Sequence, residues 1–285
     1  MTATSIVLKT RIITALILAP IAIGGIFFLP PMGFALFTAA IITLGSWEWA
    51  NMSGFEQQSG RIAYAAVIAL ILYSLIDVSA VPVLWLALIW WVVCFLLVRS
   101  YPAGSERWGS APMRALMGVL VLVPAWVGLN HLRTGGFQFG STDNNLLLIL
   151  YVFCVVWVAD IGAYFSGRAF GKAKLAPRVS PGKSWAGVYG GLIAVGAFAL
   201  VVSLLASANA TETTLLVVAT LVTGWVSVLG DLLESMLKRF RGIKDSSGLL
   251  PGHGGIMDRI DSLTAAIPVF ALIITLLGWL AVGPL

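Results

Sequence analysis

The sequence predicts an all-α, polytopic integral membrane protein in which residues 1–285 form a single membrane domain with about nine transmembrane helices. Composition is the first reason. Of all residues, 59% are hydrophobic and only 10% are charged, whereas about a quarter of the residues of a soluble domain carry charge. The second reason is a series of apolar runs, each near the length of about 20 residues that spans a bilayer. The third is that the lysines and arginines fall mainly between those runs.

Two features of the nine predicted spans need an argument, namely the nature of the first span and the division between the third and the fourth. The first follows Lys9 and Arg11, as a signal peptide would, but it is long for one and lacks a small-residue cleavage site before Pro30, so we expect a membrane helix. The third and fourth spans are separated only by a turn at residues 80–82. In order, the spans cover residues 12–30, 33–51, 61–79, 81–98, 113–132, 145–166, 186–207, 213–237 and 262–282.

The distribution of positive charge predicts the orientation of the chain. With nine spans, every lysine and arginine except Arg133 lies on the same side as the N-terminus. Because loops rich in lysine and arginine stay in the cytoplasm, we expect the N-terminus to be cytoplasmic and the C-terminus to lie outside. Topology then explains the net charge of +5, so we expect no nucleic-acid partner, whereas anionic lipid headgroups and phosphates are compatible ligands.

The two cysteines, Cys94 and Cys154, both lie inside apolar runs. We expect them to be small buried hydrophobic residues rather than a disulfide or a metal-binding pair. Polar residues concentrate instead in two long cytoplasmic loops, near residues 167–185 and 238–261. These two loops are predicted to carry the active site.

Four polar residues share one face of the eighth predicted span. Asp231, Glu234, Ser235 and Lys238 follow i, i+3, i+4, i+7 spacing. At a rise of about 1.5 Å per residue, Asp231 lies about 10 Å deeper in the membrane than Lys238. A carboxylate at that depth is costly unless it is paired, neutral or bound to a metal. The alternative to a functional role is a salt bridge to an arginine of a neighbouring helix.

A second pair of acids, Asp258 and Asp261, opens the ninth predicted span, with Arg259 between them. The simplest alternative is that these carboxylates only cap the helix. Together with Asp231 they make three acids at one membrane boundary, and hard divalent cations such as Mg²⁺ bind carboxylates together with substrate phosphates. We therefore expect Asp231, Asp258 and Asp261 to form a metal site.

A glycine-rich segment, residues 251–255, precedes that acid pair. Glycine allows positive φ angles and a close approach of the backbone to a ligand, which makes Gly254 and Gly255 candidate binding residues. His253 is either a proton carrier or a hydrogen-bonded spacer. An ordinary loop is the alternative for the whole segment.

The loop at residues 167–185 contains Gly182-Lys183-Ser184, which looks like the end of a phosphate-binding P-loop. The earlier glycine of that motif is replaced by Pro177, and we expect no strand before the loop, so a P-loop is excluded. What remains is a basic loop in which Ser180, Lys183 and Ser184 suit phosphate oxygens. The preference of positively charged loops for the cytoplasm alone explains the lysines of this loop. It does not explain Asp160, which lies just inside the membrane beside the loop.

These motifs resemble those of a known family. The segment from Ser235 to Asp261 resembles the signature of the bacterial phosphatidate cytidylyltransferases, also called CDP-diglyceride synthases, and residues 160–184 are similar to a second motif of that family. The resemblance implies the reaction of CTP with phosphatidic acid to give CDP-diacylglycerol and pyrophosphate. It also implies dependence on Mg²⁺, with a second cation possible, a homodimer, and a bacterial cytoplasmic (inner) membrane. The second motif departs from the family pattern at Ala186, where many members carry an acid or an amide.

The resemblance also implies roles for individual residues. Asp231, Asp258 and Asp261 would hold the catalytic metals, and Lys238 would face nucleotide or phosphate. With these residues we count His253, on its own chemistry, in the candidate catalytic group. The residues expected to face nucleotide, lipid phosphate or pyrophosphate are Ser180, Lys183, Ser184, Arg239, Lys244, Asp245, Gly254, Gly255 and Arg259.

Two other classes of membrane protein also use such residues. A phosphotransferase that acts on a polyprenyl carrier would use acids and basic loops, but its usual aspartate-rich motifs are not evident, and strict dependence on CTP separates the two classes. An ion-coupled transporter would explain Asp160, Asp231 and Glu234 within the membrane. It would not explain the charged loop at residues 238–261, and it would move a substrate without consuming nucleotide.

Overall fold

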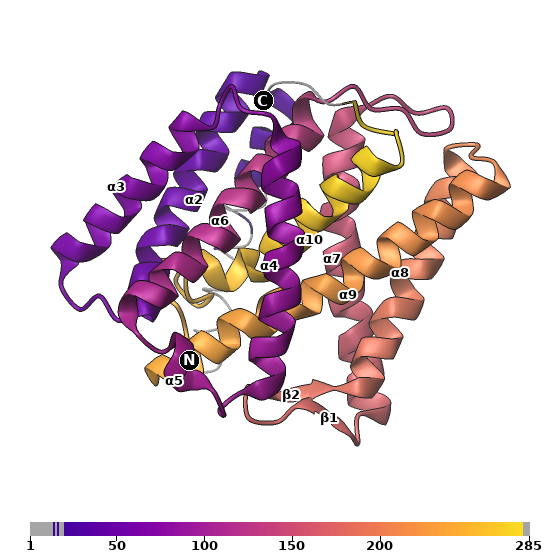
Figure 1. Cartoon of the computed structure of the whole chain (residues 1–285). Helices are drawn as coiled ribbons and strands as arrows, with labels where there is room; N and C mark the ends of the chain where they lie inside the picture. Colours follow the sequence, from indigo (N-terminus) through magenta and orange to yellow (C-terminus); the bar gives the residue numbers. More distant parts are fainter. Residues whose placement is uncertain (1–13, 15, 17–19, 282–285) are drawn as a thin grey trace.

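The computed structural model describes residues 14, 16 and 20–281. Residues 20–28 are helical, and the elements that follow them form a helical bundle with one small hairpin (Figure 1). In chain order these elements are α2 (Pro31–Ser53), α3 (Gln58–Ser74), α4 (Ala80–Ser100), α5 (Ser105–Trp108), α6 (Ala111–Thr134), α7 (Asn145–Phe170), β1 (Lys174–Ala176), β2 (Ser180–Ser184), α8 (Trp185–Leu205), α9 (Ala210–Arg241) and α10 (Met257–Leu276).

The prediction of an all-α membrane protein is confirmed. Each predicted span from residues 33–51 onward coincides with a helix, and six helices of the described chain are long and apolar enough to cross a membrane, namely α4, α6, α7, α8, α9 and α10. The helices α2 and α3 are not among these six, so the predicted number of nine is not confirmed. Much of the first predicted span, the end of the last one and both chain termini lie outside the described residues.

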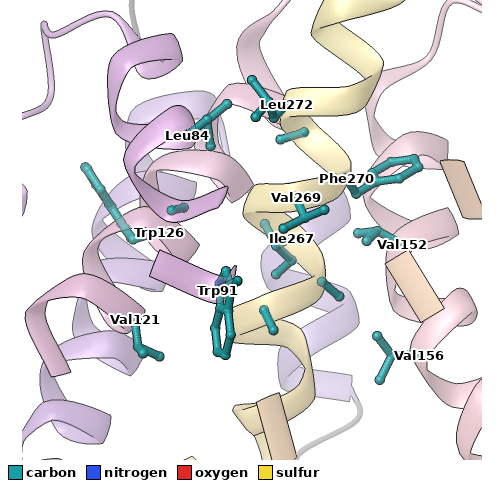
Figure 2. Close-up of a cluster of buried hydrophobic side chains, with 14 of the residues drawn as sticks. Leu84, Trp91, Val121, Trp126, Val152, Val156, Ile267, Val269, Phe270 and Leu272 are labelled. Atoms are coloured by element: carbon teal, nitrogen blue, oxygen red, sulfur yellow. The ribbon is translucent and has the colours of Figure 1, made fainter. Parts of the chain in front are cut away.

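Helix α10 lies at the centre of the bundle. Figure 2 shows its residues Ile267 and Phe270 among side chains of the surrounding helices, including Trp91 of α4, Trp126 of α6 and Val152 of α7, and all five side chains are buried. Because interiors are packed at the density of organic crystals, this contact fixes the position of α10. Its polar first turn, at Asp258, is held in place by the packing of its apolar remainder.

Helix α9 crosses the bundle diagonally and packs against α8 and α10 (Figure 1). It begins with a capping box, in which the Asn209 side chain accepts from the amide of Glu212 and the Glu212 carboxylate accepts from the amide of Asn209. It ends at Gly242, whose φ of 76° is the left-handed conformation that glycine adopts readily. The polar face predicted at the C-terminal end of this helix therefore enters the bundle beside α10.

The segment between α7 and α8 departs from the all-helical pattern. Strands β1 and β2 pair antiparallel, with Lys174 opposite Ser184 and Ala176 opposite Ser180, where we expected only a loop. The expectation that no strand precedes Gly182-Lys183-Ser184 is therefore wrong, although these residues lie within β2 itself and not in a loop between a strand and a helix. The hairpin lies at the same end of the bundle as α5, opposite the turn between α8 and α9 (Figure 1).

The cysteines have the predicted character. Cys94 of α4 is buried, Cys154 of α7 is half-buried, and both thiols are free. Neither belongs to the polar cluster described next.

Candidate active site

Lys238 of α9 bridges two carboxylates. Its Nζ atom lies 2.8 Å from Oε2 of Glu234 and 2.6 Å from Oδ1 of Asp258. The side chains are only 10%, 1% and 6% exposed for Lys238, Glu234 and Asp258. Charges with so little access to water depend on one another, since removing one leaves the others uncompensated. The bridge therefore ties α9 to the first turn of α10.

The second oxygen of Asp258 holds the loop that precedes α10. Oδ2 accepts hydrogen bonds from the backbone amides of Ser246 and Gly255, at 2.9 and 2.7 Å, and from the Ser246 hydroxyl at 2.9 Å. Asp258 thus joins the lysine of α9 to both ends of the segment between residues 246 and 255. Asp258 therefore does more than cap α10, which was the simplest alternative role for this acid.

A second ion pair lies about two turns before Lys238 on α9. Oδ2 of Asp231 is 2.7 Å from Nζ of Lys183, which lies on β2, and Oδ1 accepts from the Ser235 hydroxyl at 3.0 Å. The alternative of a salt bridge for Asp231 is found, although its partner is a lysine of the hairpin and not an arginine. Side-chain exposures of 25% for Lys183 and 32% for Asp231 leave both accessible. Asp160 of α7 lines the same hollow as both residues of the pair.

Asp261 of α10 lies where that helix meets α9, and its carboxylate accepts from the amide of Ser262. Oε1 of Glu234, on α9, is buried and accepts no hydrogen bond from any described N–H or hydroxyl group. The two helices are in close contact here, because a Cβ atom at Gly230 would lie 2.5 Å from the Asp261 carbonyl oxygen. Only glycine at position 230 lets α9 and α10 approach this closely.

These carboxyls fit a magnesium ion in part. Within the described ranges, no three His, Cys, Asp or Glu side chains converge closely enough to hold a metal ion by themselves. Mg²⁺, however, is usually bound through one or two carboxylates together with substrate phosphates and water. Glu234, whose Oε1 is buried without a hydrogen bond from any described group, is a candidate donor for such an ion, together with Asp231 and Asp261. Asp258, expected as a third ligand, is instead engaged by Lys238 and the loop.

Two hollows flank the cluster. One, of about 400 Å³, lies among α7, α8, α9 and β2, and its polar lining includes Asp160, Lys183 and Asp231. The other, of about 580 Å³, is formed by the loop before α10. Its lining includes five of the predicted site residues, namely Lys244, Asp245, His253, Gly254 and Arg259.

The remaining predicted site residues lie around this core. The Ser184 hydroxyl accepts from the amide of Gly187 and so caps α8, and Ala186 lies in the first turn of that helix. Ser180 opens β2, and Nε of Arg239 lies 3.4 Å from the carbonyl oxygen of Val179, which ties the hairpin to α9. Their contacts with a substrate stay predictions.

The glycine-rich segment approaches protein groups closely. Gly254 has a φ of 81°, and a Cβ atom there would meet the Asp258 carboxylate, whereas one at Gly255 would meet the Ser246 hydroxyl and the Glu48 carboxylate. We expected the backbone of these glycines to approach a ligand closely. In the structure it lies close to two carboxylates of the chain itself, those of Asp258 and Glu48. The Nδ1 atom of His253 is buried without a hydrogen-bond partner in the described structure.

Sequence reasoning missed Glu48, a buried acid of α2 that contacts the same loop. Two serines that it contacts, Ser246 and Ser247, were also not singled out. A signal was present, because Glu48 is an acid between two tryptophans inside an apolar run, and an ionisable residue within a membrane segment is a functional candidate by default.

The fold and the site define a class of protein, namely a helical membrane protein with a lysine–carboxylate centre at one end of its bundle. The model of the cytidylyltransferase family matches residues 9–277, and the chain belongs to that family.

Bacterial relatives resemble the chain over nearly its whole length. It is 53% identical over 274 residues to the phosphatidate cytidylyltransferase of Pseudomonas aeruginosa, covering 95% of this chain and 98% of the relative. It is 41% identical to the phosphatidate cytidylyltransferase of Haemophilus influenzae, covering 93% and 97%. The enzyme of the same name from Thermotoga maritima is 32% identical, covering 95% and 97%.

Proposed function

We propose that this protein is a phosphatidate cytidylyltransferase, which converts CTP and phosphatidic acid to CDP-diacylglycerol and pyrophosphate in phospholipid biosynthesis. One observation carries the proposal. Lys238, between Glu234 and Asp258, and Lys183, paired with Asp231, bring two cations and several carboxylates together where a polar loop meets membrane helices. A reaction between a water-soluble nucleotide and a lipid requires a site at such a boundary.

The reaction is an in-line displacement at phosphorus. A phosphate oxygen of phosphatidic acid forms a bond to the α-phosphorus of CTP, and the bond from that phosphorus to the bridging oxygen of pyrophosphate breaks. Such transfers depend on positioning and charge neutralisation more than on a covalent intermediate. The second pKa of a phosphate monoester is about 6, so the attacking group is largely deprotonated at neutral pH without a general base. His253 is then needed only to position a phosphate.

The chain's own cations neutralise the phosphates in this mechanism. Lys183 is partly exposed beside Asp231, and it can exchange that partner for a phosphate oxygen. Lys238 is more deeply buried and fixed by two acids, which suits it to orient Asp258 and the loop. Lys244 and Arg259 line the loop hollow, and neither forms an ion pair with another residue in the described structure. They are available to the triphosphate.

We propose Mg²⁺ as the cofactor, held by Asp231 and Asp261 together with Glu234. Bound there, it would polarise the phosphoryl oxygens and offset charge on the leaving pyrophosphate. Glu234 enters this group in addition to the predicted acids because its Oε1 is buried and receives no described hydrogen bond. Asp258 would act on the same group through Lys238.

The two hollows suit the two substrates. The hollow at Asp160, Lys183 and Asp231 is also lined by Val188 and Leu192 of a membrane helix, which favours the lipid phosphate with apolar chain beside it. The hollow at the loop before α10 is formed by a polar segment outside the helices. That environment favours CTP, which arrives from water.

Location, orientation and assembly complete the proposal. The helices make this a multi-pass membrane protein, and bacterial relatives support a place in the cytoplasmic (inner) membrane. We propose that the N-terminus and the active site face the cytoplasm, with the C-terminus outside, because lysine and arginine concentrate in the loops of one side. We also propose a homodimer, which light scattering of the purified protein in detergent tests.

The reaction is tested with radiolabelled CTP, phosphatidic acid and purified protein in detergent, with and without Mg²⁺. We expect label to enter the lipid extract only when phosphatidic acid and Mg²⁺ are both present. Replacing phosphatidic acid by a polyprenyl phosphate, and CTP by another nucleotide, gives the control for the rival phosphotransferase class. A folded sample that transfers no label from CTP to phosphatidic acid contradicts the proposed reaction.

A further inference from the structure

A buried acid of α2, far from the signature segment in sequence, holds the loop of the active site. Glu48 is 0% exposed, and no described cation forms an ion pair with it. A carboxylate in such a place is costly unless hydrogen bonds compensate the loss of water. The contacts of Glu48 therefore need an explanation.

Both carboxylate oxygens of Glu48 are fully engaged by the loop. Oε1 accepts from the Ser247 hydroxyl at 2.6 Å and from the Ile256 amide at 2.9 Å. Oε2 accepts from the Met257 amide at 2.7 Å and lies 3.1 Å from the Ser246 hydroxyl, whose single proton is shared with Oδ2 of Asp258. Each oxygen thus contacts one hydroxyl and accepts from one backbone amide, and the amides belong to the positively polarised N-terminus of α10. Hydrogen bonds to a charged acceptor are among the strongest in proteins.

The same segment also binds Asp258. Ser246 and Gly255 donate to Asp258, while Ser246 and the two residues after Gly255 donate to Glu48. A Cβ atom on Gly255 would meet both Ser246 and Glu48. The backbone is therefore clamped between two carboxylates, one from α2 and one from α10.

A second contact from α2 supports the first. Nδ2 of Asn51 donates to the carbonyl oxygen of Ser246 at 3.0 Å. Asn51 follows Glu48 by three positions, which puts both side chains on the same face of the helix. The loop is thus bonded to α2 at several points.

We propose that Glu48 is a positioning residue for the active site: it fixes the segment between Ser246 and Met257 and, through that segment, sets the position of Asp258 and Lys238. The inference rests on the proposed function, because it names a group that acts on the catalytic cluster without touching a substrate. It adds α2 to the elements that build the site.

The test compares Glu48→Gln with Ser46→Ala. Glutamine keeps the shape of the side chain but removes its charge. It also replaces one carboxylate oxygen, which accepts hydrogen bonds from a hydroxyl and an amide, with an NH₂ group that can only donate. Ser46 is a matched control because it is equally buried in α2 and, among the described residues, its hydroxyl bonds only to the carbonyl oxygen of Thr43 in its own helix. We expect Glu48→Gln to lower kcat at least tenfold with KM for CTP changed less than threefold, and Ser46→Ala to leave both unchanged.

A second measurement does not depend on activity. Hydrogen exchange followed by mass spectrometry should show faster exchange in residues 245–257 of Glu48→Gln, with α4 and α8 unchanged. Faster exchange throughout the bundle would overturn the proposal, because it would mean general destabilisation. Unchanged exchange in the loop would overturn it as well. If the wild-type protein transfers no label to lipid, the proposed reaction fails, whereas the exchange result still reports on Glu48.

A double-mutant comparison tests whether Ser247 acts through Glu48. Ser247 donates its hydroxyl to Glu48, so Ser247→Ala should lower kcat a few-fold in the wild-type background. In the Glu48→Gln background it should have little further effect, since residues that act as one unit are not additive. Fully additive effects on kcat would contradict the proposed connection.

Discussion

Lys238 and Asp258 form the shortest ion pair among the described residues, with Nζ 2.6 Å from Oδ1, and they join the end of α9 to the start of α10. The same lysine holds Glu234. Two acids that lie on different predicted spans are thus parts of one cluster, which depends on a single cation. Loss of that cation affects both acids at once.

Replacing Lys238 with glutamine should abolish activity and destabilise the protein. It leaves Glu234 and Asp258 buried without a cation, a situation that costs about 3–5 kcal/mol in soluble proteins. Label transfer and a thermal unfolding curve in detergent measure the two effects. Arg107→Gln is the control, because it removes the same charge from an exposed residue that has no ion pair in the described structure. Wild-type turnover in Lys238→Gln would contradict the role of the cluster.

Replacing Asp258 with asparagine should abolish turnover while the protein stays inserted in the membrane and folded. Asparagine preserves the shape but removes the charge that Lys238 and the loop amides recognise. Membrane fractionation and circular dichroism check insertion and folding, and label transfer checks activity. Asp143→Asn, an exposed acid in the loop before α7, should retain full activity. An active Asp258→Asn protein would remove Asp258 from the catalytic group.

The pair of Lys183 and Asp231 should matter for activity much more than for stability. Both side chains are partly exposed, and ion pairs with access to water contribute about 0–1 kcal/mol. The charge-swapped protein, Lys183→Asp with Asp231→Lys, should unfold near the wild-type temperature and yet transfer no label. If the charge-swapped protein transferred label at the wild-type rate, the two residues would serve only as ion-pair partners of one another.

Magnesium should act through Asp231, Glu234 and Asp261. Chelation with EDTA should stop label transfer, and added Mg²⁺ should restore it. In Asp261→Asn we expect the Mg²⁺ concentration for half-maximal rate to rise at least tenfold, because one carboxylate of the donor set is lost. An Asp261→Asn protein with an unchanged Mg²⁺ requirement would exclude that acid as a ligand.

Replacing Gly230 with alanine should separate α9 from α10. The added methyl group would meet the backbone of Asp261, and overpacking of this kind costs about 1–3 kcal/mol. We expect a lower unfolding temperature and a loss of turnover, since Asp231 would move away from Asp261. Gly248→Ala is the control, because a Cβ atom at Gly248 meets nothing within 4 Å. Equal effects of the two substitutions would contradict the helix-contact argument.

Much of the fold could be predicted from local sequence. Apolar runs reveal helices because the bilayer demands their length and composition, and spacing alone predicts that Asp231, Glu234 and Lys238 share one helix face. The hairpin was not predicted, because strands as short as β1 and β2 leave little pattern in a basic, glycine-containing loop. Its pairing depends on contacts such as that between Arg239 and Val179.

The site was harder to predict where its parts come from distant segments. Glu48 lies 198 residues from Ser246 and 209 from Met257, and nothing in the local pattern around residue 48 indicates which loop it meets. The alternative role for Asp231 was a salt bridge to an arginine of a neighbouring helix, but its ion-pair partner is Lys183 of the hairpin. Such pairs are determined by tertiary packing, which one sequence without its fold does not reveal.

The N-terminus of α10 has a consequence for how this protein handles phosphate. Many nucleotide-binding proteins hold phosphates with the free amides at a helix start, but here the amides of Gly255, Ile256 and Met257 already donate to Asp258 and Glu48. We therefore propose that lysine and arginine side chains, rather than these backbone amides, hold the triphosphate. Because such side chains are flexible, pyrophosphate would leave by their movement alone, without any unwinding of α10.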